Sequence, residues 1–254
     1  VDEAVKGLED GEILVLENLR FDKGEEGNTP EFAKSLAHFA DFYVNEAFAS
    51  SHRPHASIVS LPGEIKSKSQ NSVALGFHFK REIEELSKVF DEIKRPIVFV
   101  LGGAKAKDKL DYIFKLLGKS DKILVGGLLP RLVEEEGHTF PKERVLVGKL
   151  SFDGYDITIN TTQSFVAEIQ KAGTVVWNGP LGKFEEEGFD QGTETVAKAM
   201  AESSAFKVAG GGDTKTAIAK FGLEDKFDWI STGGGAMLEF LAKGTLPGIE
   251  AMIA

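Results

Sequence analysis

Short apolar runs alternate with amphipathic runs along most of this chain, and no other feature constrains its fold as strongly. The run at residues 97–101 is apolar throughout, which is typical of a strand buried on both faces of a sheet, and the other runs are short and mainly apolar. The runs fall at residues 97–101, 122–125, 144–147, 174–177, 206–209 and 228–231. Runs with helical period follow them, at residues 105–117, after 127, and at 162–171, 193–202, 213–221 and 235–243. This order predicts an α/β protein with a doubly wound parallel sheet, whose ligands bind beyond the carboxyl ends of the strands.

The first part of the chain carries the same alternation more sparsely. We predict a polar helix within residues 1–11, a strand at 13–17, a helix at 31–39 and a strand at 42–45. A longer amphipathic run over residues 79–93 ends before Arg95 and Pro96. It places five apolar side chains on one helical face: Ile83, Leu86, Val89, Phe90 and Ile93. We interpret this run as a helix that links two domains.

The composition narrows the class of protein. The 254 residues suffice for one large or two small domains. The net charge of −10 argues against nucleic-acid binding. No apolar run approaches the ~18 residues of a membrane span, so we expect no membrane partner. The absence of cysteine excludes disulfides and thiolate catalysis, and it is compatible with a cytoplasmic enzyme.

Glycines follow five of the predicted strands. They lie at residues 102–103, 126–127, 179, 210–212 and 233–235. Any one of them is compatible with a routine turn between a strand and a helix. Because the carboxyl ends of parallel strands meet at one edge, five such turns predict a rim of exposed amides, which is typical of a phosphate site.

The glycine run at residues 210–212 continues as Asp213, Thr214, Lys215 and Thr216. A helix that begins at Asp213 directs free amides and its positive dipole end toward a phosphate. The Asp213 carboxylate would repel that phosphate unless a cation lay between them, so the pattern predicts a magnesium nucleotide. The alternative is that Asp213 only caps the helix. The run is not a Walker A loop, because Thr214 stands where that motif has glycine before Lys215.

Two lysines follow the first glycine pair. Lys105 and Lys109 are four residues apart, so we predict that they share one face at the first turn of a helix and neutralise phosphate oxygens. A solvated basic helix start is the alternative. The glycine fingerprint of dinucleotide-binding proteins is absent, which argues against a nicotinamide-dependent dehydrogenase.

Arginines follow both strands predicted in the first part of the chain. Arg20 and Arg53 have the forked guanidinium that binds phosphate or carboxylate through two hydrogen bonds. His52 and His55 are spaced like a pair of metal ligands, but Pro54 interrupts any helix between them. We therefore prefer the interpretation that the two histidines do not bind metal.

Six ordered blocks of this sequence resemble the phosphoglycerate kinase family. They are Leu-Glu-Asn-Leu-Arg-Phe at 16–21, Val-Asn-Glu-Ala-Phe at 44–48, Leu-Gly-Gly-Ala-Lys at 101–105, Trp-Asn-Gly-Pro-Leu-Gly at 177–182, Gly-Gly-Gly-Asp-Thr at 210–214 and Ser-Thr-Gly-Gly-Gly-Ala at 231–236. The resemblance implies reversible transfer of the acyl phosphate of 1,3-bisphosphoglycerate to ADP, which gives 3-phosphoglycerate and ATP. It also implies Mg²⁺, ADP and ATP as ligands, and a monomer.

The resemblance implies a role for each matching residue. Arg20 and Arg53 are expected to bind 3-phosphoglycerate, and Asp213 to hold Mg²⁺. The residues expected at the transferring phosphoryl group are Lys105, Gly234 and Gly235. Those expected to bind the nucleotide are Gly103, Lys109, Asn178, Glu185, Gly211, Gly212, Asp213 and Thr214.

The resemblance also implies the domain plan. It predicts two doubly wound parallel-sheet lobes, of which the N-terminal one is incomplete because further basic substrate ligands of the family find no match. Residues 1–78 are expected to form this partial lobe, 79–94 an interlobe helix, 95–230 the nucleotide lobe, and 231–254 a helix and tail that return to the first lobe. For these residues alone, the sequence predicts nucleotide binding without measurable turnover. A noncatalytic remnant therefore stays open as the alternative to an active kinase.

Several segments depart from the family pattern, and two of them bear on the expected site. After the glycines at 126–127 the chain continues with Leu128, Leu129, Pro130 and Arg131 where the family has small residues and methionine. This predicts a reshaped adenine pocket. The histidine that usually precedes Ser-Thr-Gly-Gly-Gly is also absent, since Trp229 occupies that region.

Overall fold

The computed structural model describes residues 1–92, 94–105 and 107–253. They divide into two compact units. One unit comprises Val1–Arg81 with the tail from Thr245 onward, and the other comprises Glu82–Gly244. The tail thus leaves the second unit at residue 245, whereas the sequence predicted that the return would begin at residue 231.

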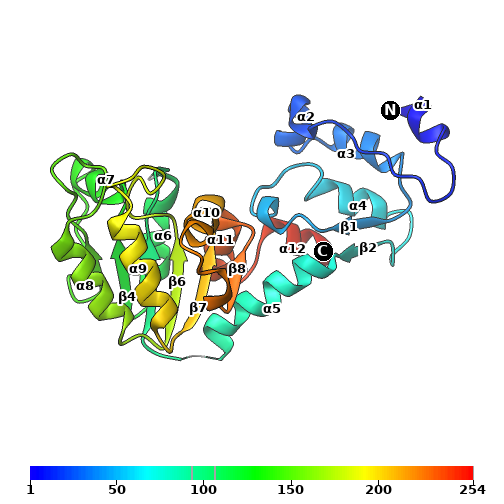
Figure 1. Ribbon diagram of the computed structural model, residues 1–254. Coiled ribbons are helices and arrows are strands. Elements are labelled where there is room, and N and C mark those ends of the chain that lie inside the picture. Colours follow the sequence, from blue (N-terminus) through cyan, green and yellow to red (C-terminus); the bar gives the residue numbers. More distant parts are fainter. Residues whose placement is uncertain (93, 106, 254) are drawn as a thin grey trace. The chain divides into compact units, whose positions relative to one another are not determined.

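A six-stranded parallel sheet forms the centre of the second unit (Figure 1). Its strands run in the order β5-β4-β3-β6-β7-β8, and this order reverses between β3 and β6. The strands are β3 (Ile97–Leu101), β4 (Lys122–Val125), β5 (Val145–Val147), β6 (Thr174–Asn178), β7 (Phe206–Gly210) and β8 (Trp229–Ser231). The architecture confirms the predicted doubly wound α/β class.

Helices pack on both faces of this sheet. α8 and α10 lie against α9, while α7 and α11 lie against α6. The helices are α5 (Phe77–Asp91), α6 (Lys107–Leu117), α7 (Leu129–Glu135), α8 (Ile159–Ile169), α9 (Gln191–Glu202), α10 (Gly212–Lys220) and α11 (Gly234–Lys243). A short helix, η3 (Glu224–Lys226), precedes β8. Val98 and Val100 of β3 join Phe165 of α8 and Val196 of α9 in one core cluster, which explains why the central strands read as continuous apolar runs.

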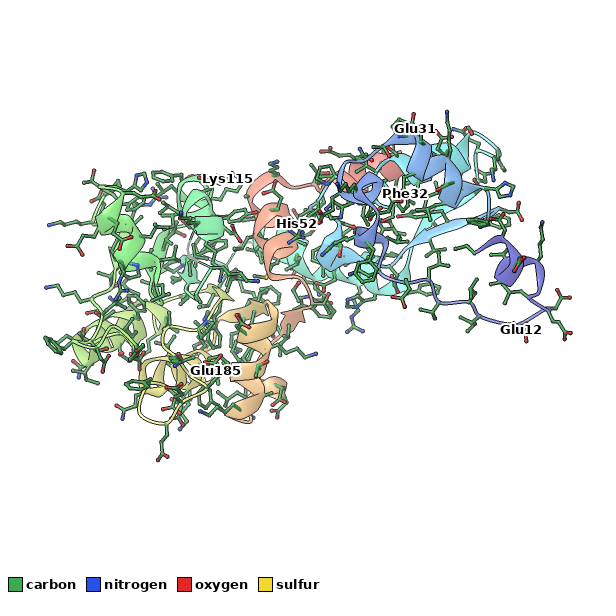
Figure 2. All side chains as sticks on the ribbon, turned by 90° about the horizontal axis from the view of Figure 1, so that it is seen from above. Glu12, Glu31, Phe32, His52, Lys115 and Glu185 are labelled. Carbon is green, nitrogen blue, oxygen red and sulfur yellow. The ribbon has the colours of Figure 1, made fainter. Side chains whose placement is uncertain are left out.

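A carboxylate links α6 to α11. The Tyr112 hydroxyl of α6 donates to Glu239 Oε2 at 3.0 Å. Lys115, labelled in Figure 2, places its Nζ 3.8 Å from the same oxygen in an ion pair with Glu239. Nζ of Lys243 lies 2.5 Å from Oε1. These contacts fix α11, whose first turn belongs to the site described below.

The first unit contains a two-stranded parallel sheet of β1 (Tyr43–Asn45) and β2 (Val73–Leu75). Its helices are α1 (Asp2–Lys6), η1 (Leu19–Phe21), α2 (Lys23–Glu26), α3 (Pro30–Ala37), η2 (Phe48–Ser50), α4 (Ser60–Lys66) and α12 (Pro247–Ile253). α12 is attached by the Gly248 amide, which donates to Ser51 O at 3.0 Å. Lys66 Nζ donates to Met252 O at 2.8 Å and holds the other end of α12.

Several predicted elements differ from the structure. The strand predicted at residues 13–17 is wrong: the segment is irregular, and Ile13 and Val15 are 88% and 85% exposed. Among the described residues no strand pairs with it, and a strand needs a paired neighbour for its backbone groups. The linking helix begins at Phe77, while Ile93, predicted on its apolar face, lies outside the described residues.

No described helix combines the length and the apolar content that a membrane crossing requires.

Candidate functional site

The site lies where the strand order reverses. Leu101 of β3 stands beside Asn178 of β6 in the parallel register. The chain then leaves β3 toward α6 and leaves β6 toward α9, so the two loops diverge and open a crevice. In open α/β sheets this switch point is where ligands bind.

The backbones of these two loops touch directly. The Gly102 amide donates to Asn178 O at 2.9 Å. A Cβ at Gly179, whose φ is +92°, would lie 2.1 Å from Gly102 O. Only glycine permits this approach and this φ, so both glycines set how closely the two loops meet.

Internal hydrogen bonds use most of the amides that the sequence predicted as an exposed rim. The Gly103 amide donates to Pro180 O at 2.6 Å, and the Gly127 amide donates to Leu181 O at 3.1 Å. The prediction was wrong for these turns, because buried backbone groups must find partners within the protein. Amides without a partner in their own helix remain at the starts of α10 and α11.

The N-termini of α10 and α11 open into the same hollow. The hydrogen bond from Lys215 N to Gly211 O is the first of α10, and that from Met237 N to Gly233 O is the first of α11. The amides of residues 212–214 and 234–236 precede these bonds, so they have no partner within their helices. Two helix N-termini with free amides form a strong anion site.

This hollow has a volume of about 200 Å³. It brings together nine of the residues singled out in the sequence: Lys105, Lys109, Asn178, Gly211, Gly212, Asp213, Thr214, Gly234 and Gly235. The remaining two from this unit, Gly103 and Glu185, line the cavity next to it. We call the hollow the phosphate end.

The two lysines occupy different backbone environments. Lys109 lies on α6, and its Nζ donates to Gly102 O at 2.5 Å and Asn178 O at 3.5 Å. Burial lowers the pKa of Lys109 to about 8, while nearby Asp213 opposes that shift. Lys105 is in the preceding loop because α6 begins at Lys107, so the predicted shared helical face is wrong. Residue 106, between them, lies outside the described residues.

Two buried side chains hold the turns of this edge together. The Thr214 hydroxyl oxygen accepts a hydrogen bond from the Gly179 amide at 2.7 Å. The Asn178 Nδ2 donates to Gly210 O at 2.7 Å. A Cβ at Gly234 would lie 2.7 Å from that same Nδ2. The turns after β6, β7 and β8 are therefore packed into one unit.

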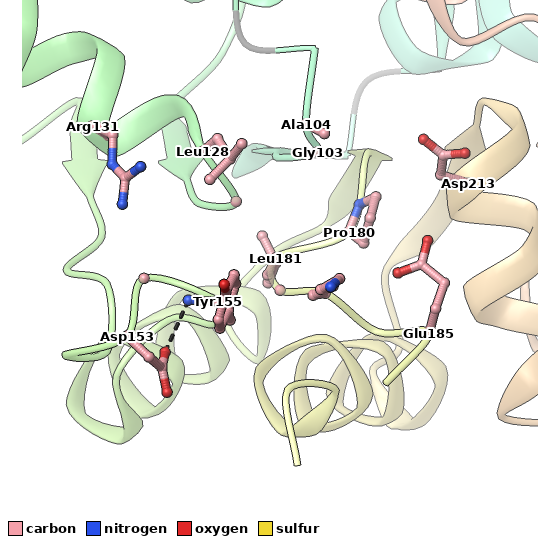
Figure 3. Close-up of a pocket in the computed structure, with 14 residues that line it drawn as sticks. Gly103, Ala104, Leu128, Arg131, Asp153, Tyr155, Pro180, Leu181, Glu185 and Asp213 are labelled. Atoms are coloured by element: carbon pink, nitrogen blue, oxygen red, sulfur yellow. Dashed lines mark hydrogen bonds between the residues drawn. The ribbon is translucent and has the colours of Figure 1, made fainter. Parts of the chain in front are cut away.

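A larger cavity of about 680 Å³ continues from the phosphate end, with which it shares Ala104 and Asp213. Figure 3 shows Asp213 and Glu185 on one side of it and Arg131 on the other. Apolar side chains lie between them: Leu128, Pro180 and Leu181. This volume and this apolar lining with a few polar groups are typical of small-molecule sites.

The sequence assigned no individual role to three residues that shape this cavity. Thr193 Oγ1 accepts hydrogen bonds from the amides of Leu181 and Gly182 at 3.0 and 3.1 Å, so it holds the loop after β6. Tyr155 and Arg131 line the wall. Only Arg131 carried a signal, as part of the segment that departs from the family pattern.

The two predicted substrate arginines belong to the other unit. Arg20 lies in η1, where its amide donates to Asn18 Oδ1 at 3.1 Å, and Arg53 lies in the turn after η2. Both are exposed. Among the residues that the structure describes, no group of three or more acidic or histidine side chains is arranged to hold a metal ion. His55, one of the two histidines considered above, has its Nδ1 3.8 Å from Glu25 Oε1.

Comparison with protein families and curated sequences gives consistent matches. The model of the family described as phosphoglycerate kinase matches residues 1–139 and 132–244. The phosphoglycerate kinase of Thermosipho africanus is 40% identical over 302 residues, which cover 99% of this chain and 74% of the relative. That of Gloeobacter violaceus is 38% identical over 311 residues, with the same coverage.

Solved structures of the same family match the fold. The phosphoglycerate kinase from Pyrococcus horikoshii is 31% identical, with a TM-score of 0.80 over 99% of this chain and 75% of that chain. The one from Coxiella burnetii is 32% identical, with a TM-score of 0.73 over 93% of this chain and 71% of that chain.

Proposed function

Because the chain belongs to the phosphoglycerate kinase family, we propose that its site serves reversible phosphoryl transfer between 1,3-bisphosphoglycerate and ADP. In the forward direction the bond between the acyl oxygen and phosphorus breaks, and a bond forms between that phosphorus and a β-phosphate oxygen of ADP. The products are 3-phosphoglycerate and ATP. The observation that carries the proposal is the pair of helix N-termini that open beside two lysines at the sheet's switch point.

The nucleotide is proposed to extend across both hollows. Its phosphates occupy the phosphate end, against the amides of Gly211, Gly212 and Thr214 and the amine of Lys109. Glu185, which lines the larger cavity next to Asp213, is placed to accept hydrogen bonds from ribose hydroxyls. The remaining cavity then holds the base between apolar side chains.

Mg²⁺ is proposed to be held by Asp213. The donor set fits this ion, because Mg²⁺ commonly binds one or two carboxylates and takes its other ligands from water and phosphate oxygens. Asp213 lines both hollows, so its carboxylate borders the expected phosphate position. The bound ion would neutralise charge on the phosphate oxygens.

The protein's own contribution is positioned positive charge. Phosphoryl transfer depends on electrostatic stabilisation of the equatorial oxygens and on alignment of the reacting groups. The exposed amine of Lys105 is proposed to follow the phosphoryl group, and the amides of Gly234 and Gly235 to donate to its oxygens. Asn178 and Thr214, through their buried hydrogen bonds, keep these donors in place.

The binding site for 3-phosphoglycerate and 1,3-bisphosphoglycerate is proposed to lie on the smaller unit. Arg20 and Arg53 are exposed there, and their guanidinium groups suit the phosphate and carboxylate of 3-phosphoglycerate. We also propose that residues 1–78 form the substrate lobe, 79–94 the linking helix, 95–230 the nucleotide lobe and 231–254 the returning segment, of which residues up to Gly244 still belong to the second unit and only those from Thr245 onward belong to the first. We further propose that the protein is a monomer, that its substrates are small molecules and that it acts in the cytoplasm.

The proposal is tested by measuring ADP formation from ATP as a function of 3-phosphoglycerate. Since the matched relatives are longer than this chain, the assay uses two preparations: the 254 residues, and the same chain fused to the N-terminal segment of the Thermosipho africanus relative. We expect activity that depends on 3-phosphoglycerate in the fusion. In the fusion, Lys105→Ala should lower kcat, and the control Lys107→Ala should not, because Lys107 lines neither hollow. Absence of this activity from both preparations contradicts the proposal.

A further inference from the structure

Arg131 lies on the side of the larger cavity opposite Asp213. Figure 3 shows its guanidinium directed toward the cavity from α7. The side chain is exposed, and it makes no hydrogen bond or ion pair with the described residues. All of its donors are therefore available to a ligand.

The opposite wall leaves room for this guanidinium. Gly154 has a φ of +77°, and a Cβ there would lie 2.7 Å from Nη2 of Arg131. Its turn is fixed by Asp153, whose Oδ1 accepts hydrogen bonds from Ser151 Oγ at 2.6 Å and from the Tyr155 amide at 2.9 Å. The arginine therefore faces a turn that is already ordered and that lacks a side chain at the contact.

The layout of the cavity decides which part of a nucleotide reaches Arg131. The phosphate end fixes one terminus of the ligand, and Glu185 lies near that terminus. Leu128, Pro180 and Leu181 then offer apolar surface suited to the faces of a ring. The base is the last part of the nucleotide, so its edge meets the guanidinium.

An arginine discriminates between purine edges by its hydrogen-bonding pattern. It has five N–H donors and no acceptor. The O6 and N7 atoms of guanine are both acceptors and pair with its fork, whereas adenine presents an N6 donor beside N7. A guanidinium at an adenine edge thus sets donor against donor.

We propose that Arg131 makes this site select 6-oxopurine nucleotides, those of guanine and hypoxanthine, over adenine nucleotides. ADP remains a co-substrate, but a weaker one. The inference rests on the proposed function, because it assumes that a nucleotide occupies the cavity.

The test is calorimetric titration of the chain with Mg-ADP, Mg-GDP and Mg-IDP. GDP and IDP should bind roughly tenfold more tightly than ADP, which is within the range that one bidentate arginine contact gives. IDP should match GDP, because hypoxanthine keeps O6 and N7 and lacks only the 2-amino group. Arg131→Gln should reverse the order in favour of ADP, since a glutamine amide pairs with N6 and N7 of adenine.

Lys142→Gln is the matched control. Lys142 is also an exposed cation of the same unit, and it lines neither hollow, so the ratio of affinities should not change. Circular dichroism checks that each variant is folded, and Arg131→Lys, which keeps the charge but loses the fork, should bring the ratio near one. Equal or tighter binding of ADP by the wild type overturns the inference alone. An equal loss for all three ligands in Arg131→Gln also overturns it, because the arginine would then act only as a charge. If none of the three diphosphates binds, the proposed function fails as well.

Discussion

The carboxylate of Glu82 accepts a hydrogen bond from the indole Nε1 of Trp229 at 2.8 Å. That bond uses Oε2 of Glu82, whereas Oε1 accepts hydrogen bonds from the amide and the hydroxyl of Thr232, each at 2.7 Å. Glu82 is fully buried on α5, and Thr232 directly precedes the glycines that begin α11. One side chain therefore ties α5 to the turn that delivers the amides of the phosphate end.

Glu82→Gln should destabilise the chain by about 1–3 kcal/mol, because a glutamine NH₂ on the buried side chain would face at least one of these part-buried donors. Denaturant unfolding measures the loss. Glu85→Gln is the control on the same helix. Glu85 pairs with Lys88 in a partly exposed i,i+3 contact, so its loss should cost less than about 0.5 kcal/mol. Equal losses in the free energy of unfolding for the two substitutions would contradict a special role of Glu82.

Substitutions at two glycines should distinguish a glycine needed for packing within the protein from a glycine needed only for contact with the ligand. A Cβ at Gly234 would lie 2.7 Å from Asn178 Nδ2 and 2.8 Å from Gly211 Cα, whereas a Cβ at Gly212 would meet nothing within 4 Å. Gly234→Ala should therefore lower both the melting temperature and the affinity for Mg-ADP. Gly212→Ala should keep or raise stability, since alanine favours a helix by up to about 1 kcal/mol over glycine. It should still weaken binding if phosphate oxygens approach that backbone.

Differential scanning calorimetry and nucleotide titration of both variants check this pair. Unchanged affinity in Gly212→Ala would mean that phosphate does not lie against the first turn of α10.

Nucleotide affinity should depend on pH through Lys109. Burial lowers the pKa of its amine to about 8, so in the free protein the amine loses its proton as the pH rises through 8. A bound phosphate favours the charged amine, and binding above pH 8 therefore takes up a proton. The affinity for Mg-ADP should fall between pH 8 and 9.5, by at most about tenfold per pH unit.

The same shift affects stability with a defined sign. The unfolded chain keeps the ordinary lysine pKa of 10.5, so between pH 8 and 10.5 it binds more protons than the folded chain. The contribution of this group to the free energy of unfolding therefore rises with pH in that window. Lys109→Met should remove both dependences, as titrations at pH 7.5, 8.5 and 9.5 would show. A pH profile of binding that survives this substitution would assign it to another group.

Asp213→Asn should weaken mainly the magnesium-dependent part of ADP binding. An amide keeps the size of the carboxylate and loses the charge that a hard cation prefers. Calorimetry of wild type and variant, each with Mg²⁺ and with EDTA, measures that part directly. Equal affinity of the wild type with and without Mg²⁺ would exclude the metal role of Asp213.

The sequence predicted the large sheet well because its strands are buried on both faces. The bounds predicted for β3 and β4 match the structure, since continuous apolar runs between turn residues leave little ambiguity. The first unit was harder. β2 has only three residues and α4 contains a proline and a glycine, so neither gives a periodic signal. The strand predicted at residues 13–17 depended on pairing that a local pattern does not contain.

The site residues likewise include some that the sequence predicted and some that it did not. The glycines and lysines near the strand ends could be recognised from their spacing in the sequence. Together with adjacent residues they make up the nine predicted site residues that line the phosphate end. Tyr155 lines the cavity from a turn before α8, and Thr193 of α9 holds the loop after β6 by accepting a hydrogen bond from the Leu181 amide. Nothing in their local sequence links them to β6, so only the folded chain reveals them.

The most direct test of the account is a ¹H–¹⁵N correlation spectrum of the chain titrated with Mg-ADP. The account predicts that the largest shifts fall on the amides of Gly212, Gly234 and Gly235, at the two helix N-termini. The amides of Gly118 and Gly222, which follow the opposite ends of α6 and α10, should move little. Saturable shifts at the three glycines would support the phosphate end, and saturable binding that leaves them unmoved would contradict it.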